Sequence, residues 1–341
     1  MKALYVGIQT AGTTSQLRAD TLRRVVPCEW TMIDTDRAFL PFPRWARSLW
    51  FRLRTGPAVQ ALNRLVCSEI GDESYDVAWI DKGVCLWPST IRKIRSVARR
   101  LIYYTPDTSF MANGSRFFRA TAHLYNFIVT TKSLEIDSFR KLVDADRLIL
   151  VTQSYDSQLH IPRMEFAQKR KEAVLIGLYE ADRGNCVQTL LSRGISVRVG
   201  GRGWSSFLRK NSGNALLHFD GEEVFGVRYA ELLSQAMIGL GLMTKRFPEL
   251  HTTRTFEIPA CGTALATERN AETSAIFRED EAVFFGDYND LADRILSLFA
   301  EPARLQAVTN AGIQRVQQGD FSNEKVIRRI MVQAGLGGRN Q

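Results

Sequence analysis

The sequence predicts an α/β protein of two domains, each built on a parallel β-sheet. Short apolar runs alternate with amphipathic stretches along nearly the whole chain, a pattern typical of βαβ units. The pattern restarts after a polar stretch, Gln153–Lys171, which has no clear period and contains Pro162. The length of 341 residues also suits two domains of ordinary size.

In the first half, six apolar runs bounded by charged or turn residues predict strands. They are Lys2–Gly7, Trp30–Ile33, Asp76–Ile80, Leu101–Tyr104, Phe127–Thr130 and Leu148–Val151. After the first run, Gly7–Ser15 is a loop rich in Gly and Thr, and Gln16–Val26 has a helical pattern. We place the N-terminal domain at residues 1–160.

In the second half, five further runs predict strands. They are Ala173–Leu178, Ser196–Gly200, Met237–Leu242, Thr263–Ala266 and Val283–Phe285. A helical tail, Glu301–Ala334, follows them. We place the second domain at residues 161–320, and we expect residues 321–341 to form a C-terminal helix and tail that return to the N-terminal domain. Open parallel sheets bind ligands at the carboxyl ends of their strands, so the expected ligand site is the cleft between the domains.

Charge is unevenly distributed. Lys and Arg number 45 and Asp and Glu 36, which gives a net charge of +9. Residues 1–160 contain 22 basic and 15 acidic side chains, so most of the excess lies in the first half. An anionic partner is therefore expected to meet that half. The basic residues are scattered and match no nucleic-acid-binding motif, so we do not expect a nucleic acid partner.

Compartment and metal content follow from a few residue types. Five widely spaced cysteines without a CxxC pair predict reduced thiols in the cytoplasm, with the inner face of the membrane as the alternative. The longest apolar stretch, around Ala236–Met243, is far shorter than the roughly 20 residues that cross a bilayer. Two Asp-x-Asp triplets, Asp34–Asp36 and Asp144–Asp146, have the positions of turn residues. We therefore expect no metal.

The most informative segment is Phe247–Thr263, which predicts a loop entering a helix that ends at Gly262. Backbone N–H groups at a helix start attract anions, and three hydroxyl residues are expected there, beside basic side chains. These residues are Thr252, Thr253, Thr255, Arg254, Lys245 and Arg246. A diphosphate fits such a place, and Glu257 can accept hydrogen bonds from ribose hydroxyls. The alternative is a surface loop followed by a core helix.

At this point the sequence resembles a known family. Thr244–Gly262, TKRFPELHTTRTFEIPACG, is similar to the C-terminal domain of GT-B glycosyltransferases, specifically the CgeB-like branch of the family-4-type (group 1) enzymes. Gly177–Gly184, Val199–Trp204 and Ala282–Ile295 resemble the same module. The resemblance covers nearly the whole chain but is weak in residues 1–100. It implies two Rossmann-like domains facing a central cleft, and a sugar nucleotide as co-substrate with no further cofactor.

The resemblance also implies roles for single residues. Glu257 matches the second glutamate of the E-x7-E motif, which holds the donor ribose, and Glu249 matches the first, which contacts the donor sugar. Related sequences often have Asp at this first position, so His251 is a rival for the sugar contact. Arg183 matches the basic position that holds the donor diphosphate, and its alternative role is that of a solvated arginine at a helix start.

A glycine-rich turn follows the second strand of the second domain. Gly200, Gly201 and Gly203 allow the backbone to approach a ligand, and Trp204 can stack on the base or sugar or form a wall of that site. An ordinary tight turn is the alternative. The turn is not a dinucleotide-binding fingerprint, because the G-x-G-x-x-G spacing is absent.

The N-terminal domain contributes candidates for the acceptor side. The loop with Gly12, Thr13 and Ser15 follows the first strand and can approach donor phosphate or acceptor. Asp107 follows a later strand, directly after Pro106. It can accept the proton of an acceptor hydroxyl or position that hydroxyl, and the alternative is an Asx turn. Lys132 ends the next strand and is expected near the same cleft.

A basic and aromatic stretch, Ala38–Arg54, contains four arginines and no acidic residue. Helical spacing from Pro43 puts the arginines toward one side and Trp45, Leu49 and Leu53 toward the other. Two interpretations remain open. The helix contacts an anionic lipid surface near a lipid-linked acceptor, or it packs on the sheet with a solvated Arg face.

The function expected from these observations is transfer of a hexosyl group, from a UDP-sugar by default, to a hydroxyl of a glycan, glycolipid or other acceptor. The resemblance implies retention of the anomeric configuration and a role in polysaccharide or cell-envelope synthesis. Because a fold does not fix a function, a non-catalytic protein that binds sugar nucleotides or polysaccharides on the same scaffold is the alternative.

Overall fold

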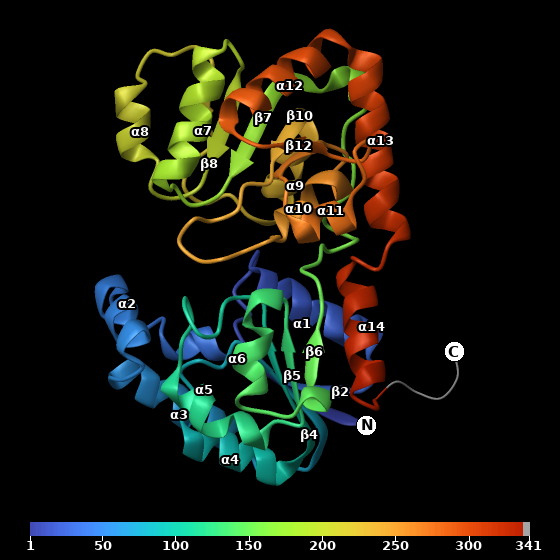
Figure 1. Cartoon of the computed structure of the whole chain (residues 1–341). Coiled ribbons are helices and arrows are strands. Elements are labelled where there is room, and N and C mark those ends of the chain that lie inside the picture. Colours follow the sequence, from blue (N-terminus) through green and yellow to red (C-terminus); the bar gives the residue numbers. More distant parts are fainter. Residues whose placement is uncertain (337–341) are drawn as a thin grey trace. The chain divides into compact units, whose positions relative to one another are not determined.

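The computed structural model describes residues 1–336. Contacts within the chain define two units, each with its own sheet (Figure 1). Unit 1 comprises Met1–Thr152 and the segment from Glu324 onward, and unit 2 comprises Gln153–Asn323. The domain boundaries expected from the sequence lie after residue 160 and after residue 320.

Unit 1 is built on six parallel strands in the order β2-β1-β3-β4-β5-β6. They are β1 (Lys2–Gly7), β2 (Glu29–Asp34), β3 (Tyr75–Asp81), β4 (Ala98–Thr105), β5 (Phe127–Thr130) and β6 (Leu148–Leu150). The central strands β3 and β4 are almost continuously buried, as expected for parallel strands covered on both faces. The edge strand β6 has only three residues, which limits the exposed edge.

Helices and short 3₁₀ turns connect these strands. The α-helices of unit 1 are α1 (Thr14–Val25), α2 (Arg44–Leu53), α3 (Pro57–Glu69), α4 (Pro88–Val97), α5 (Arg116–Thr121), α6 (Ile136–Arg140) and α14 (Asn323–Gln333). The turns are η1 (Thr35–Ala38), η2 (Ala122–Leu124), η3 (Ser133–Glu135) and η4 (Ala145–Arg147). Proline in the first turn starts α3 and α4, where its missing N–H costs nothing.

The last helix, α14, completes the core of unit 1. Its apolar side chains share one buried cluster with Tyr5 and Trp79 of the sheet. They are Val326, Ile327, Ile330, Met331 and Ala334. An ion pair of 2.8 Å joins Glu324 to Arg24 of α1, and Figure 1 shows α14 alongside α1. Unit 1 therefore has a core made from both ends of the chain.

Unit 2 repeats the architecture with the strand order β12-β11-β10-β7-β8-β9, again all parallel. The strands are β7 (Arg170–Ile176), β8 (Val197–Gly200), β9 (Leu217–Phe219), β10 (Ala236–Leu240), β11 (Ala264–Glu268) and β12 (Val283–Phe285). The connections are η5 (Phe166–Gln168), α7 (Ala181–Ser192), α8 (Ser205–Lys210), α9 (Gly226–Gln235), α10 (Arg254–Ala260), α11 (Ala271–Ile276), α12 (Tyr288–Ala300) and α13 (Pro302–Gln318). Two buried clusters, one on each face of this sheet, form its core.

The prediction of two parallel α/β sheets is confirmed, and all eleven expected runs form strands. A twelfth strand, β9, was not predicted. Its three residues lie at the edge of the sheet and are half-buried or exposed, so they lack the apolar run that marks the other strands. The predicted helical tail is two helices, α13 and α14, because the segment around Gly319 interrupts it.

Candidate functional site

In unit 2, polar side chains gather on the loops that follow β7, β8, β10 and β11. Because all of these strands are parallel, their carboxyl ends meet at one edge of the sheet. The loops begin at Gly177, Gly201, Gly241 and Arg269. This edge contains most of the residues that the sequence selects in the second half.

The loops after β7 and β8 pack tightly on each other. The Gly177 N–H donates to the Gly200 carbonyl at 2.8 Å, and the Trp204 indole N–H donates to the Gly177 carbonyl at 3.0 Å. Gly201 has φ +116°, and a Cβ there would lie 2.3 Å from the Gly177 carbonyl oxygen. The turn therefore depends on glycine at position 201.

Two members of the glycine-rich turn differ in what they offer a ligand. Trp204 is completely buried among Tyr179 and Phe207, so its ring has no face for a base or sugar. The ring positions the Gly177 backbone instead, which corrects the expectation that it stacks on a ligand. Gly203 is exposed with φ +90°, and a Cβ there would lie 3.2 Å from the Tyr179 Cβ.

Two arginine side chains converge beside Gly177. A Cβ on this residue would lie 3.2 Å from Arg183 Nη1 and 3.5 Å from Arg254 Nη1. Arg183 comes from the first turn of α7 and donates to the Leu178 carbonyl at 2.8 Å. Arg254 is the first residue of α10, and its Nη2 donates to the Leu242 carbonyl at 3.5 Å. The fold thus brings together two arginines that are 71 positions apart in the chain.

These guanidinium groups lie close together in a largely buried place. Burial, and then the charge of Arg254, lower the pKa of Arg183, while Glu180 and Glu249 act in the opposite direction. Glu180 is 3.7 Å from Arg183 Nη1, but it also accepts a hydrogen bond from the Thr244 hydroxyl at 3.0 Å. The Nε atoms of both arginines are buried and have no hydrogen-bond partner among residues 1–336. An anion beside Gly177 would offset the repulsion between the two charges.

The threonines flank Arg254 in the chain, and Lys245 lies earlier in the same loop between β10 and α10. Lys245 is half-exposed and forms an ion pair of 2.5 Å with Glu268, the last residue of β11. The Thr255 hydroxyl accepts from the Thr252 N–H at 3.1 Å, and Thr253 precedes α10 without a side-chain cap. Because α10 has only seven residues, its dipole is small, and the positive charge of the site comes mainly from the arginines.

Glu257 lies one turn into α10 and is buried. Its Oε2 accepts from the Tyr229 hydroxyl at 2.7 Å, and its Oε1 is 3.9 Å from His160 Nε2. Tyr229 comes from α9, and no local sequence pattern marks it as a site residue. A carboxylate held in this way keeps acceptor capacity, because each oxygen can accept more than one hydrogen bond.

Glu249 and His251 follow β10 in the same loop. Glu249 is half-buried, and its charge acts on Arg183. His251 is buried, and both of its ring nitrogens are engaged: Nδ1 lies 2.5 Å from Glu272 Oε2, and Nε2 accepts from the Gln153 N–H at 2.9 Å. This pairing assigns the proton to Nδ1 and occupies both ring nitrogens of His251 within the protein.

In unit 1, the corresponding edge holds Asp107. Lys82 Nζ lies 2.9 Å from its Oδ2, and the Asn113 amide donates to the same oxygen at 3.0 Å. Burial acts to raise the pKa of Asp107, but Lys82, Lys132 and Arg18 outweigh it and lower that pKa. A carboxylate with a lowered pKa is a weak proton acceptor, so its environment favours positioning of a group over removal of its proton.

The loop after β1 is tied to a buried ion pair. The Ser15 hydroxyl donates to Asp81 Oδ1 at 3.2 Å, and Arg18 binds both oxygens of Asp81 at 2.7 and 3.1 Å. Thr13 caps α1 by accepting from the Gln16 N–H at 3.2 Å, and Gly12 has φ +81°. The pair Asp81 and Arg18 was missed in the sequence, although Asp81 directly ends an apolar strand.

Helix α2 does not bury its apolar side. Ala46 is its one buried residue, whereas Trp45 is 72% exposed, Leu53 57% and Leu49 46%. Leu40, just before the helix, is 59% exposed. The interpretation of this stretch as a helix packed on the sheet through Trp45, Leu49 and Leu53 is therefore wrong.

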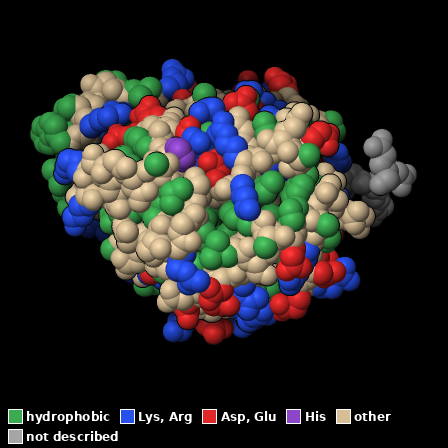
Figure 2. Space-filling model, turned by 90° about the horizontal axis from the view of Figure 1, so that it is seen from above, with side chains coloured by type: hydrophobic (Ala, Val, Ile, Leu, Met, Phe, Trp, Pro, Cys, Tyr) green, Lys and Arg blue, Asp and Glu red, His purple; other side chains and the backbone are tan. Residues whose placement is uncertain are grey.

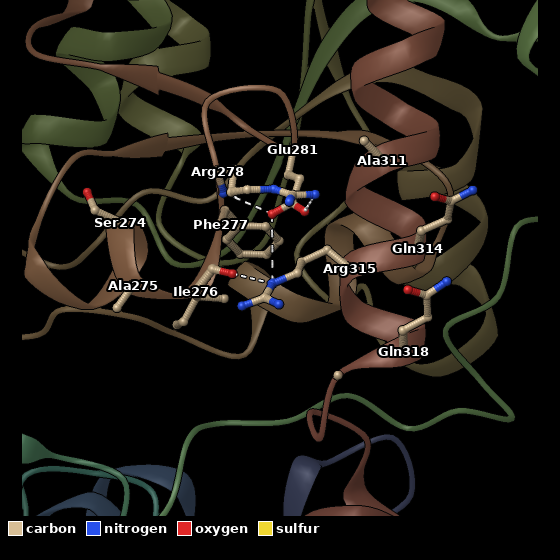
Figure 3. A pocket seen from close by; sticks show the side chains of 11 residues that line it. Ser274, Ala275, Ile276, Phe277, Arg278, Glu281, Ala311, Gln314, Arg315 and Gln318 are labelled. Atoms are coloured by element: carbon tan, nitrogen blue, oxygen red, sulfur yellow. Dashed lines mark hydrogen bonds and ion pairs between the residues drawn. The ribbon is translucent and has the colours of Figure 1, made fainter.

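Features outside this edge complete the description. A cavity of about 370 Å³ lies between α11 and α13, where Arg278 and Arg315 both approach Glu281 (Figure 3). On the face drawn in Figure 2, basic side chains are interspersed with acidic ones. Within residues 1–336, no cluster of His, Cys, Asp and Glu is suited to a metal ion, and no helix is long and apolar enough to span a membrane.

Residues 183–332, less than half of the chain, match a family model described as "Glycosyl transferase-like". No curated protein sequence matches significantly.

Solved structures match along nearly the whole chain. HepE from Anabaena, solved with UDP, is 10% identical with a TM-score of 0.65, over 98% of this chain and 100% of that one. Sucrose-phosphate synthase from Thermosynechococcus elongatus is 13% identical with a TM-score of 0.70, over 98% of both chains. AviGT4, a glycosyltransferase involved in avilamycin A biosynthesis, is 13% identical with a TM-score of 0.60, over 98% of this chain and 97% of that one.

These similarities establish the fold. The chain has two six-stranded parallel sheets, and the structures of HepE and sucrose-phosphate synthase each match 98% of it. This architecture is the GT-B fold of glycosyltransferases. The family-model match supports a glycosyltransferase, and it includes both arginines beside Gly177.

Proposed function

We propose that this protein is a glycosyltransferase that moves a hexosyl group from a nucleoside diphosphate sugar, UDP-linked by default, to a hydroxyl of a glycan or glycolipid. One observation carries the proposal. Arg183 and Arg254 converge on the Gly177 backbone with buried Nε atoms that lack partners among the described residues. Two adjacent guanidinium groups match the charge and the forked geometry of a diphosphate. HepE, a similar structure, was solved with UDP and with UDP-glucose.

In the proposed reaction, the bond between the sugar and the diphosphate breaks as the acceptor oxygen bonds to the anomeric carbon, and the proton of the acceptor hydroxyl passes to the leaving diphosphate. Charge develops on the leaving diphosphate, where Arg183 and Arg254 stabilise it, with Lys245 nearby at the same edge. Glu249 contacts the sugar, and Asp107 orients the acceptor hydroxyl. We further propose retention of configuration. We also propose that no metal is required, because these arginines supply the positive charge at the diphosphate.

Binding of UDP is the direct test of this function. We expect UDP, more than GDP or dTDP, to raise the unfolding temperature, because a ligand that binds only the folded state stabilises it. We also expect slow hydrolysis of a matching UDP-sugar. Liquid chromatography measures it as the UDP that is released. Binding of UDP without turnover of any UDP-sugar, across a panel of donors and acceptors, would contradict the catalytic proposal and favour a binding protein.

Removing the Glu257 carboxylate should weaken nucleotide binding. We expect Glu257→Ala to cost roughly 1–3 kcal/mol of UDP affinity, the range for leaving buried polar groups unpaired. Calorimetry measures the effect. Glu231→Ala, at a partly exposed position of α9, is the matched control and should bind UDP normally. If dUDP, which lacks the ribose 2′-hydroxyl, loses as much affinity as UDP in the Glu257 variant, a contact between Glu257 and that hydroxyl is excluded.

We propose that the stretch Ala38–Arg54 holds the protein on an anionic lipid surface, near a lipid-linked acceptor. Its exposed apolar side chains and its arginines, with no acidic residue in the stretch, have the composition of an interfacial helix.

Vesicle binding tests this contact. The double variant Trp45→Ser with Leu49→Ser should bind phosphatidylglycerol-containing vesicles at least tenfold more weakly, since each buried side chain contributes roughly 1.5–3 kcal/mol. Phe225→Ser with Val227→Ser removes two equally exposed apolar residues from unit 2 and is the matched control. Equal sedimentation of both double variants would exclude α2 as the contact.

A further inference from the structure

Unit 1 contains a basic hollow at the amino ends of its strands, whereas Asp107 follows the carboxyl end of β4. It has a volume of about 330 Å³ and is formed where β4 and β5 begin and where β6 is about to begin. The residues that line it are Arg95, Arg100, His123, Leu124, Asn126, Phe127, Asp146 and Arg147. None of these residues belongs to the proposed transfer site, because they lie at the amino ends of the strands rather than the carboxyl ends.

The three arginines in this hollow have no counter-charge in contact. Arg95 Nη1 donates to the Ala98 carbonyl at 2.9 Å, and Arg147 Nη2 donates to the carbonyls of His123 and Tyr125. Carbonyl groups orient a guanidinium without neutralising it. Within residues 1–336, the Arg100 side chain has no hydrogen bond, and none of the three arginines forms an ion pair, although Asp146 lines the same hollow.

In the cavity between α11 and α13 of unit 2, by contrast, a carboxylate balances the charge of the arginines. There, Arg278 Nη2 lies 2.9 Å from Glu281, and Arg315 Nε lies 3.7 Å from the same carboxylate (Figure 3). That carboxylate occupies the position an anionic ligand would take. In the hollow of unit 1, Asp146 is in the lining, but among the described residues no carboxylate forms an ion pair with the three arginines.

We propose that this hollow is a second ligand site, which binds a phosphoryl group through Arg95, Arg100 and Arg147. Each guanidinium offers several N–H donors in a planar fork, and few of them are used among residues 1–336. Three positive charges against one lining carboxylate leave a net charge that suits a phosphate dianion or a diphosphate. Leu124 and Phe127 give the hollow an apolar wall, so a small organic group attached to the phosphate also fits.

The phosphoryl group has two sources that differ in chemistry. It is either the terminal phosphate of a free metabolite or the diester of a polymer or lipid headgroup. Inorganic pyrophosphate and glycerol 3-phosphate represent the first source, and glycerophosphoglycerol represents the second. Calorimetry with these three probes identifies the source, and each probe is small compared with the hollow.

The matched pair of variants is Arg100→Ala and Arg99→Ala. Both residues are in β4 and both changes remove one positive charge, but Arg99 is exposed and lies outside the hollow. Measurements use the full chain carrying Arg254→Ala, so that the proposed donor site contributes little. We expect Arg100→Ala to weaken binding of at least one probe tenfold or more, and Arg99→Ala to change it less than twofold.

Two results would overturn the proposal. One is equal affinity of the Arg100 and Arg99 variants for every probe, and the other is no measurable binding of any probe to the parent chain. A folded state that matches the parent by circular dichroism and unfolding temperature accompanies each measurement. Failure of the donor-site proposal leaves this comparison intact, because its readout is the difference between two variants on β4.

Discussion

Replacing Arg254 by alanine should reduce kcat/KM for sugar transfer by about 10²–10³, the range for loss of one well-placed donor to a developing anion. Arg254 and Arg183 lie beside the same point of the Gly177 backbone, and each keeps a buried Nε atom without a partner among the described residues. Removing Arg254 leaves a single guanidinium to stabilise the leaving diphosphate. The measurement is steady-state release of UDP from the donor, with and without acceptor.

Two further variants separate charge from geometry in this experiment. Arg254→Lys keeps the charge but loses the fork, so it should recover part of the activity and not all of it. Arg209→Ala removes an exposed arginine from the end of α8 and should retain parental activity. Near-normal transfer by a folded Arg254→Ala protein would show that the diphosphate does not bind beside Gly177.

Gly201→Ala should lower the free energy of unfolding by roughly 3–5 kcal/mol, from backbone strain at positive φ together with a forced displacement of neighbouring backbone. The new Cβ would lie 2.3 Å from the Gly177 carbonyl oxygen, which cannot move without shifting Trp204 and the arginines beside Gly177. Urea denaturation measures the loss, and UDP affinity should fall in the same variant.

Gly213→Ala is the control for this variant. It also has positive φ, +86°, but no atom lies within 4 Å of the new Cβ, so it should cost only about 1–2 kcal/mol. The difference between the two variants isolates the contact between the loops after β7 and β8. If both variants lose the same stability, close approach of these loops contributes nothing, and glycine at 201 serves conformation alone.

The strands were predictable because parallel, doubly covered strands are short and continuously apolar. Lys2–Gly7 and Phe127–Thr130 were predicted with the bounds that the structure has. The edge strand β9 lacked this signal, since one of its faces is open to solvent. Its pairing with β8 depends on backbone hydrogen bonds, which the sequence does not reveal.

The candidate site was predictable in part. Arg254 was selected as a basic residue at an expected helix start and Arg183 through a family resemblance, and the structure brings them to one place. It could not show that Trp204 points into the core, because glycine-rich turns at strand ends look the same whether the next side chain faces ligand or protein. The partners of His251 and Glu257 come from elements distant in sequence, Glu272 and Tyr229, and such long-range pairing has no local pattern.

The return of α14 to the first sheet has a consequence for the order in which the protein is made. Unit 2 is one continuous segment and is fully synthesised before Glu324, where α14 enters unit 1. Unit 1 starts first, yet Tyr5 and Trp79 stay without part of their cover until the last helix leaves the ribosome. On the ribosome, therefore, the domain synthesised second is the first that can complete its fold, and the domain that contains the N-terminus completes its core last.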